Sequence, residues 1–168
     1  MKMKNTFYLV LGFVLIFTSC QTKKEPAPVD PAPVKSEVTK MLNDMNAVLK
    51  TKDIKSLMTF YTDDAVFCGT DPSEILDKSA YEKTINTMLT ESKSMFDFKI
   101  DIVVVQIDKR GESAIVVRQF IPDWSSPLPV RETLHLIKQD QKWLVNFSDF
   151  ALIPLNKDIP AIRAAAGK

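Results

Sequence analysis

Five carboxylates fall close together in one short segment of the chain, among the residues YTDDAVFCGTDPSEILDK. They are Asp63, Asp64, Asp71, Glu74 and Asp77. Carboxylates at this density could bind a metal ion, exchange protons with a substrate, or bind the backbone of a turn and cap a helix. Gly69 and Pro72 lie among them and are typical of a turn.

A metal centre is the weakest of these readings. Zinc is bound by clusters of His and Cys, and the sequence offers one His, His135, besides Cys20 and Cys68. Calcium prefers an oxygen-rich loop of defined spacing, which the acidic segment does not match. We therefore expect no metal and no cofactor, and we expect Cys68 to be a packed side chain rather than a nucleophile.

A second set of reactive side chains lies near the C-terminus, in PVRETLHLIK and KWLVNFSDFALI. Alternate residues of a strand share a face, so Arg131, Thr133 and His135 point together. Trp143, Val145, Phe147 and Asp149 form the corresponding set on the next strand. A carboxylate and an imidazole that meet in a dry cavity could act as base and acid, with a guanidinium binding an oxyanion. The alternatives are a packed core histidine and an ion pair between Arg131 and Asp149.

Aromatic side chains could line a cavity for a flat or apolar ligand. The candidates are Phe60, Tyr61, Phe67, Trp124, Trp143 and Phe147. Most of them are also good core residues. Trp124 differs because it falls in the Pro- and Ser-rich loop PDWSSPLP, where it could lie at a pocket mouth or contact another protein.

Helices are expected in the first half of the region that would position these side chains. Val38, Met41, Leu42, Met45, Val48 and Leu49 recur with helical spacing. Ser36 is the expected N-cap of that helix, and Asp53 that of a short second one. Ser79 and Glu82 match a capping box before a third helix. The acidic segment is then best explained by turn and cap chemistry.

Strands are expected in the second half. DFKIDIVVVQID, SAIVVRQFI, PVRETLHLIK and KWLVNFSDFALI are rich in β-branched and aromatic residues, and turn residues separate them. Helices followed by a run of antiparallel strands predict an α+β domain, with the sheet curled over a helical layer.

The segment from Tyr61 to Lys78 also resembles the SnoaL-like branch of the nuclear transport factor 2-like superfamily. Members of that branch have an acidic pair that ends a helix, a strand, and a Gly-Thr-Asp-Pro turn followed by a Glu. Arg131-Glu132-Thr133 and Trp143-Leu144-Val145 are similar to the R-x-T and W-x-I/V strands of the family. The resemblance covers about residues 36–152.

The resemblance implies a cone-shaped fold in which three N-terminal helices pack on a curved, mainly antiparallel sheet. It also implies a pocket inside the cone and a homodimer formed through the outer face of the sheet. It places Arg131, His135 and Asp149 on the inward face, with Asp149 and His135 as the candidate catalytic residues and Arg131 as a ligand-binding residue. Tyr61, Phe67, Trp124 and Phe147 complete the expected ligand site. Many members carry histidines where Phe147 and Asp149 stand, so chemistry that needs those histidines is not expected.

The N-terminus predicts a membrane anchor. Lys2 and Lys4 precede the apolar run from Phe7 to Thr18, which is too short to span a membrane and fits a signal peptide. Thr18-Ser19-Cys20 resembles a bacterial lipobox, which implies lipidation of Cys20. We expect a signal peptide at 1–19, a Pro-rich linker at 20–34, the domain at 35–156 and a tail at 157–168.

The sequence thus predicts a lipid-anchored protein of the bacterial cell envelope, periplasmic or surface-exposed. The balanced charge of 22 basic and 21 acidic residues makes nucleic acid an unlikely partner. The favoured function is binding of a small apolar or aromatic molecule in the conical pocket without chemistry. The alternatives are an isomerase or lyase that uses Asp149 and His135, and a structural dimerisation module.

Overall fold

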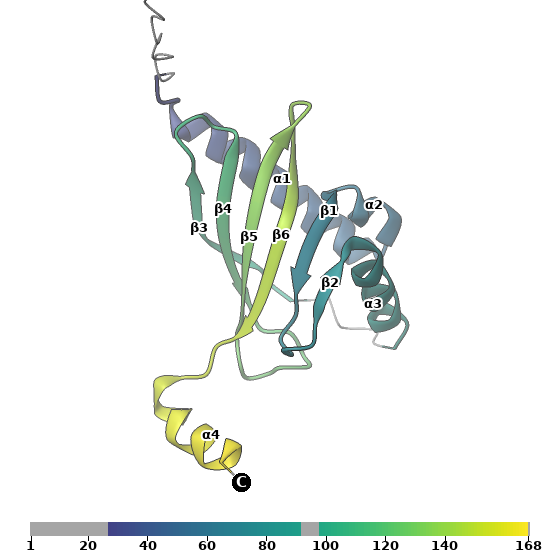
Figure 1. Cartoon of the computed structure of the whole chain (residues 1–168), viewed down its shortest axis with the longest axis vertical. Helices are drawn as coiled ribbons and strands as arrows, with labels where there is room; N and C mark the ends of the chain where they lie inside the picture. The colour runs from purple at the N-terminus through teal and green to yellow at the C-terminus, as the bar shows by residue number, and fades with distance from the viewer. Residues whose placement is uncertain (1–26, 92–97, 168) are drawn as a thin grey trace, which may run out of the picture.

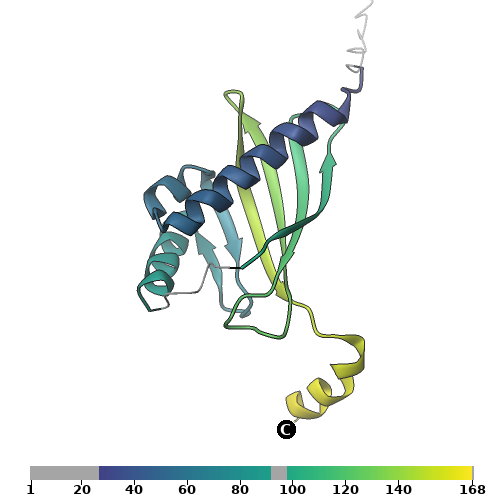
Figure 2. The same ribbon diagram turned by 180° about the vertical axis from the view of Figure 1, so that it is seen from behind.

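The computed structural model describes residues 27–91 and 98–167 and has the expected α+β architecture. One curved sheet of six strands carries helices α1, α2 and α3 on a single face, and α1 crosses that face diagonally (Figures 1 and 2). The strand order is β2-β1-β6-β5-β4-β3. The sheet is mixed, because β1 runs parallel to β6 whereas every other neighbouring pair is antiparallel.

Helix α1 spans Pro31–Thr51 and begins earlier than expected. Its N-cap is Asp30, which accepts a hydrogen bond from the Ala32 amide, and not Ser36. Proline fits the first turn of a helix because the amides there have no partner inside the helix. The folded region therefore starts inside the Pro-rich stretch, at Pro31 rather than residue 35.

The two shorter helices also carry aspartate caps. Helix α2 (Ile54–Met58) is capped by Asp53 through the Ser56 amide, as expected. Helix α3 (Lys78–Glu91) follows Asp77, which accepts a hydrogen bond from the Ala80 amide at 2.7 Å. The capping box predicted at Ser79 is therefore wrong by two residues, and Ser79 lies inside the helix.

Strands β1 (Tyr61–Cys68) and β2 (Ile75–Asp77) form a hairpin at one edge of the sheet. The acidic pair Asp63 and Asp64 lies within β1 and does not end a helix. A register shift between Tyr61 and Val66 interrupts the pairing of β1 with β6, and both aspartates are exposed there. Strand β2 was not expected from the sequence, since its three residues are too few to show an alternating pattern.

The remaining strands are β3 (Asp101–Ile107), β4 (Ser113–Phe120), β5 (Val130–Gln139) and β6 (Lys142–Leu152). The pairing of β5 with β6 slips between His135 and Leu136, so that Asn146 is an extra residue in β6. Such a bulge reverses the alternation of side chains beyond it. Trp143 and Val145 therefore point to the helices, and after the bulge it is Ser148 that is buried.

The core lies between the concave face of the sheet and the three helices. Val38, Leu42 and Met45 of α1 pack against apolar residues of β4, β5 and β6. The start of α1 is also attached to the β5–β6 hairpin, because Glu37 accepts hydrogen bonds from Lys138 and the Trp143 indole. These contacts hold the helical layer over the sheet and enclose the interior of the cone.

The C-terminal residues form a helix where a tail without structure was expected. Helix α4 (Ile159–Ala166) follows a short 3-10 turn at Asn156–Asp158 and extends away from the domain (Figure 1). None of its residues is buried. Among the described residues, no helix is long and apolar enough to cross a membrane. The expected signal peptide and Cys20 lie outside the described residues.

Candidate functional site

A cavity of about 210 Å³ opens between the concave face of the sheet and the helices. Its walls are mainly apolar and come from every layer of the fold. Met45 and Leu49 line it from α1, Ile85 and Met88 from α3, and Phe120 from β4. The cone predicted from the sequence is therefore hollow, as a ligand site requires.

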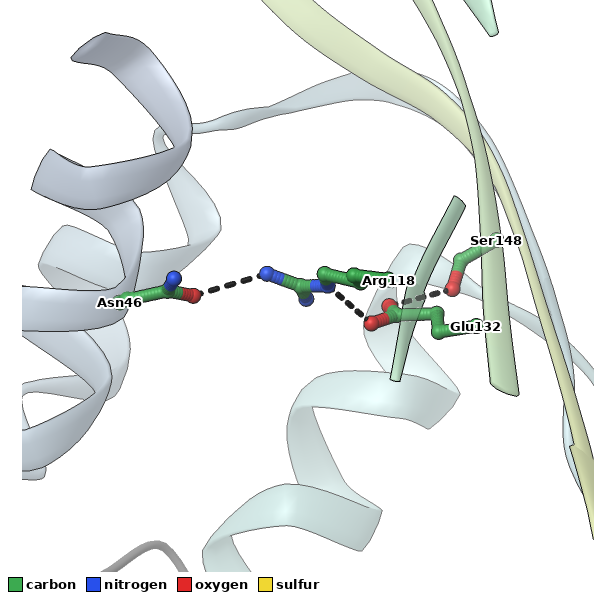
Figure 3. Close-up of polar contacts among 4 residues, drawn as sticks. All are labelled: Asn46, Arg118, Glu132 and Ser148. Carbon is green, nitrogen blue, oxygen red and sulfur yellow. Dashed lines mark hydrogen bonds and ion pairs between the residues drawn. The ribbon is translucent and has the colours of Figure 1, made fainter. Parts of the chain in front are cut away.

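One part of the cavity wall is charged. Arg118 of β4 and Glu132 of β5 both line it, although their exposed fractions are only 4% and 1%. The Arg118 Nε donates to Glu132 Oε2 in a short ion pair. Figure 3 shows the two neighbours that complete the network: Arg118 Nη1 donates to Asn46 of α1 at 2.8 Å, and the Ser148 hydroxyl donates to Glu132 Oε1 at 2.9 Å.

The Arg118 guanidinium keeps its charge although it is buried. Burial opposes the charge of the guanidinium, but the attraction and hydrogen bond of Glu132 outweigh it and raise the pKa of Arg118. A buried charge is tolerated only when it is paired and its hydrogen bonds are satisfied. Asn46 accepts a further bond from Arg118, and Ser148 donates one to Glu132, which fixes the geometry of the pair.

An aromatic wall stands beside this network. The Phe67 ring stacks on Tyr81 at 3.7 Å and meets the edge of Tyr61 at 4.9 Å, measured between centroids. The Tyr61 and Tyr81 rings meet edge to face, with centroids 5.8 Å apart. Burial, followed by the nearby Glu132 charge, raises the pKa of Tyr61 to about 12, and burial likewise raises the pKa of Tyr81. Both hydroxyls therefore keep their protons at physiological pH.

The turn from Gly69 to Glu74 lies at the cavity wall and confirms the turn chemistry expected of the acidic segment. The Asp71 carboxylate accepts from the Ser73 amide at 2.8 Å, and Glu74 accepts from the Asp71 amide at 3.1 Å. A Cβ on Gly69 would lie 2.0 Å from Glu74 Oε2, so this close approach requires glycine. Over residues 27–91 and 98–167, no group of three or more His, Cys, Asp or Glu could hold a metal ion.

Three of the residues predicted for the ligand site do line the cavity: Tyr61, Phe67 and Trp124. Trp124 is 48% exposed, and of the two roles considered for its loop the structure places it at the pocket. Cys68 is partly buried and is not among the residues that line the cavity.

Arg131, His135, Phe147 and Asp149 do not line the cavity, so the inward face inferred for them is wrong. In β5 the buried residues are Glu132, Leu134 and Leu136, which puts Arg131 and His135 on the outer face. The register joins Thr133 to Asp149 and His135 to Phe147, so all four side chains do share a face, as expected. In β5 the prediction is wrong because Arg131 and His135 were assumed to point inward. In β6 it is wrong because the bulge at Asn146 reverses which side chains point inward.

On the outer face these residues contact other partners. Arg131 donates two hydrogen bonds to the Gln119 side chain, at 3.0 and 2.9 Å, and remains exposed. The His135 Nδ1 lies 2.6 Å from Asn146 Oδ1. His135 is therefore not a core histidine, and the ion pair considered for Arg131 and Asp149 is not found among the described residues.

Four residues of the buried network were not predicted from the sequence: Arg118, Glu132, Asn46 and Ser148. A usable signal existed in β4, where Arg118 follows Ala114 and Val116 at intervals of two residues. An arginine in phase with buried apolar residues is expensive unless a carboxylate faces it. Glu132 is likewise in phase with Leu134 and Leu136, and the register pairs the two residues directly.

Comparison with known proteins gives a family and a fold. A model of the SnoaL-like domain family matches residues 38–147. No curated protein matches the sequence. A nuclear transport factor 2-like protein of unknown function from Pseudomonas putida KT2440 is similar in structure, with a TM-score of 0.59 and 16% identity, covering 76% of this chain and 92% of that one.

Two further solved structures have comparable likeness. A putative calcium/calmodulin dependent protein kinase II association domain from Xanthomonas campestris gives a TM-score of 0.57 at 23% identity, covering 70% of this chain and 86% of that one. A putative scytalone dehydratase from Novosphingobium aromaticivorans DSM 12444 gives a TM-score of 0.56 at 15% identity, covering 73% of this chain and 86% of that one. At these identities the likeness shows the fold alone.

Proposed function

Because the chain belongs to the SnoaL-like domain family, we propose that it binds a small apolar or aromatic molecule in its cavity without converting it. The observation that supports this proposal is the cavity itself, whose walls are mainly apolar and whose few polar side chains include Arg118, Glu132 and the two tyrosines. Apolar walls with a few placed polar groups are typical of ligand sites.

The volume of the cavity sets the size of the ligand. Sites for drug-sized ligands occupy about 300–1,000 Å³, whereas a cavity of about 150 Å³ holds benzene. The 210 Å³ found here suits a molecule of one substituted ring. A larger ligand would have to displace Trp124, which is half exposed.

Binding is favoured over conversion by the positions of the acid and base groups. The isomerase or lyase reading required Asp149 and His135 in the cavity, and they lie on the opposite face of the sheet. Glu132 does line the cavity, but its two oxygens are hydrogen-bonded to Arg118 and Ser148. A carboxylate held in this way is fixed toward Arg118 and Ser148 rather than toward a ligand.

The proposal can be tested by nuclear magnetic resonance of methionine methyl groups, since Met45 and Met88 line the cavity. Titration with toluene and phenol should shift these two signals to saturation. Replacing Ile85 by Trp should fill the cavity and abolish the shifts, whereas Ile162→Trp, the same change on the exposed helix α4, should not. Saturable shifts that persist in the Ile85→Trp protein would sink the proposal.

The lipid anchor belongs to the same proposal. The Lys-flanked apolar leader and the Thr18-Ser19-Cys20 sequence support lipidation of Cys20, and the Pro-rich segment would hold the domain away from the membrane. A bacterial strain that expresses the full chain and is fed labelled palmitate should incorporate label into the wild type but not into Cys20→Ser. Label that is retained by the Cys20→Ser protein would exclude this residue as the anchor.

We also propose that the chain forms a homodimer through the outer face of the sheet. Val104, Ile115 and Val117 lie together there, and Val104 and Ile115 are 43% and 39% exposed. Exposed apolar residues that cluster on one face favour association.

A further inference from the structure

The polar groups at the cavity wall limit which ligands can bind. This inference rests on the proposed binding function and concerns the chemistry of the ligand. Beside the aromatic wall these groups are the Arg118 guanidinium, the Glu132 carboxylate and the hydroxyls of Tyr61 and Tyr81, and Thr70, Glu74 and Thr84 also line the cavity. The question is which of them can still form a hydrogen bond with a ligand.

The acceptor groups beside Arg118 each accept a hydrogen bond from within the network. One Glu132 oxygen accepts from Arg118 Nε and the other from the Ser148 hydroxyl, while the Asn46 carbonyl oxygen accepts from Arg118 Nη1 (Figure 3). A ligand that donates a hydrogen bond at this place would compete with these contacts.

Donor capacity remains. The third guanidinium nitrogen, Arg118 Nη2, has no hydrogen bond to another residue among those that the structure describes, and Figure 3 draws none to it. The tyrosines add hydroxyl hydrogens, since their raised pKa values keep both protonated. The Nη2 atom is not among the buried atoms without a partner, so it is accessible from the cavity and a ligand oxygen could accept its hydrogen bond.

The charge of Arg118 is already balanced. Glu132 is 1% exposed and contacts the guanidinium directly, so an anionic ligand at Arg118 would place a second carboxylate beside the first. Two like charges in a buried site repel, and the ligand would also lose its hydration. The pair therefore supplies a strong donor without supplying net positive charge.

We propose that the cavity selects uncharged aromatic molecules that carry one hydrogen-bond acceptor, such as a carbonyl oxygen, and rejects carboxylates of the same shape. The ring packs against the wall formed by Tyr61, Phe67 and Tyr81, where edge and face contacts are favourable. The acceptor oxygen lies toward Arg118.

Three probes of nearly equal size and shape test this selection: acetophenone, benzoate and isopropylbenzene. They differ in the group attached to the ring, which is a neutral acceptor, an anion and an apolar branch. Titrations followed at the Met45 and Met88 methyl groups should give a dissociation constant about tenfold lower for acetophenone than for isopropylbenzene, as expected for a bond from a charged donor. Benzoate should bind more weakly than both.

A pair of double variants tests the residues. Arg118→Met/Glu132→Leu removes both buried charges together and so avoids leaving one unpaired. It should retain isopropylbenzene binding and lose the preference for acetophenone. Arg131→Met/Asp149→Leu removes the same two charge types from the outer face and should keep the preference of the wild type.

Each outcome is decisive. Benzoate binding more tightly than acetophenone would overturn the inference and identify an anion site. Equal affinity for acetophenone and isopropylbenzene would also overturn it, while leaving the proposed binding function intact. If none of the three probes saturates, the binding function itself fails and this inference fails with it.

Discussion

At the scale of single residues, the Arg118–Glu132 pair is the part of the interior most sensitive to change. Both side chains are buried, and Asn46 and Ser148 satisfy further bonds. The intact pair adds little to the free energy of unfolding, because desolvation of two charges offsets most of their attraction. Breaking the pair is different, since it leaves one buried charge without its partner.

Replacing Arg118 by Met should therefore lower the free energy of unfolding by about 3–5 kcal/mol. The double variant Arg118→Met/Glu132→Leu should recover most of that loss, because no charge then remains buried. Urea denaturation measures both, and Arg131→Met on the exposed face is the control and should change stability little. A double variant as unstable as the single one would contradict this reading of the pair.

The two buried tyrosines predict a loss of stability at alkaline pH. The pKa of Tyr61 is raised to about 12 in the folded protein, against about 10 in the unfolded chain. Between these values the folded state holds the proton and the unfolded state releases it, so stability falls as the pH rises. Two pKa units correspond to roughly 2–3 kcal/mol.

Urea denaturation at a series of pH values from 9 to 12 measures this loss, with Tyr61→Phe as the comparison. The phenylalanine variant should show a shallower decline over that range, because it has one fewer proton to release. Equal slopes for the two proteins would show that Tyr61 ionises normally in the folded state.

The candidate site could be predicted in part at this scale. Tyr61, Phe67 and Trp124 were recognised because aromatic side chains in a hollow fold often line the hollow. Arg131, His135 and Asp149 were grouped correctly but assigned to the wrong face, since a two-residue period shows which side chains point together and not which way they point. The charges of Arg118 and Glu132 were the unused signal for this network. Each charge is in phase with buried apolar residues of its strand, so each needs a buried partner.

At the scale of elements, the helices were predictable, and so was the Asp53 cap of α2, but the first residues of α1 and α3 were not. Asp77 and Ser79 are both residue types that cap helices, and the sequence alone favoured Ser79 through the capping box. Strand β2 decides between them: it ends at Asp77, which places this carboxylate directly before the first turn of α3. A three-residue strand leaves no pattern to read.

Replacing Asp77 by Ala should destabilise the protein by about 1 kcal/mol, the typical value of an N-cap. Ser79→Ala should be neutral or slightly stabilising, because Ser79 is an exposed residue within the helix and alanine has the higher helix propensity. Thermal unfolding followed by circular dichroism separates the two. A larger loss for Ser79→Ala than for Asp77→Ala would restore the capping box.

At the scale of the whole molecule, the order of elements carried the prediction of the fold. Three helices followed by four long strands allow few arrangements other than a sheet curled over a helical layer. The sheet is mainly antiparallel, as expected, but the sequence did not show which pair is parallel, because that depends on β1 inserting beside β6. The bulge at Asn146 also had no signal in the sequence, yet it decides which β6 residues reach the cavity.

Helix α4 should be dispensable for the domain. It contains no buried residue and extends away from the sheet (Figure 1). A chain ending at residue 153 should therefore have the same melting temperature and the same methionine methyl spectrum at Met45 and Met88 as the longer chain. A melting temperature lower by several degrees would show that α4 stabilises the domain.

The outer face of the sheet argues for a dimer at this same scale. Val104 of β3 and Ile115 and Val117 of β4 lie on this face. His135 of β5 pairs with Ile115 on one side and with Phe147 of β6 on the other, so Phe147 lies on the same face. Stable interfaces bury about 800 Å² on each partner, which a four-stranded face can supply. Light scattering on residues 21–168 should give twice the mass of one chain.

The substitution Ile115→Glu should convert this dimer into a monomer, because association would bury an unpaired carboxylate at the centre of the face. Ile162→Glu makes the same change on helix α4 and should leave the dimer intact. The cavity lies on the other side of the sheet, so the Ile115→Glu monomer should still bind acetophenone. A wild-type chain that remains monomeric at every concentration would contradict the proposed dimer. Loss of acetophenone binding in Ile115→Glu would show that the outer face and the cavity are coupled.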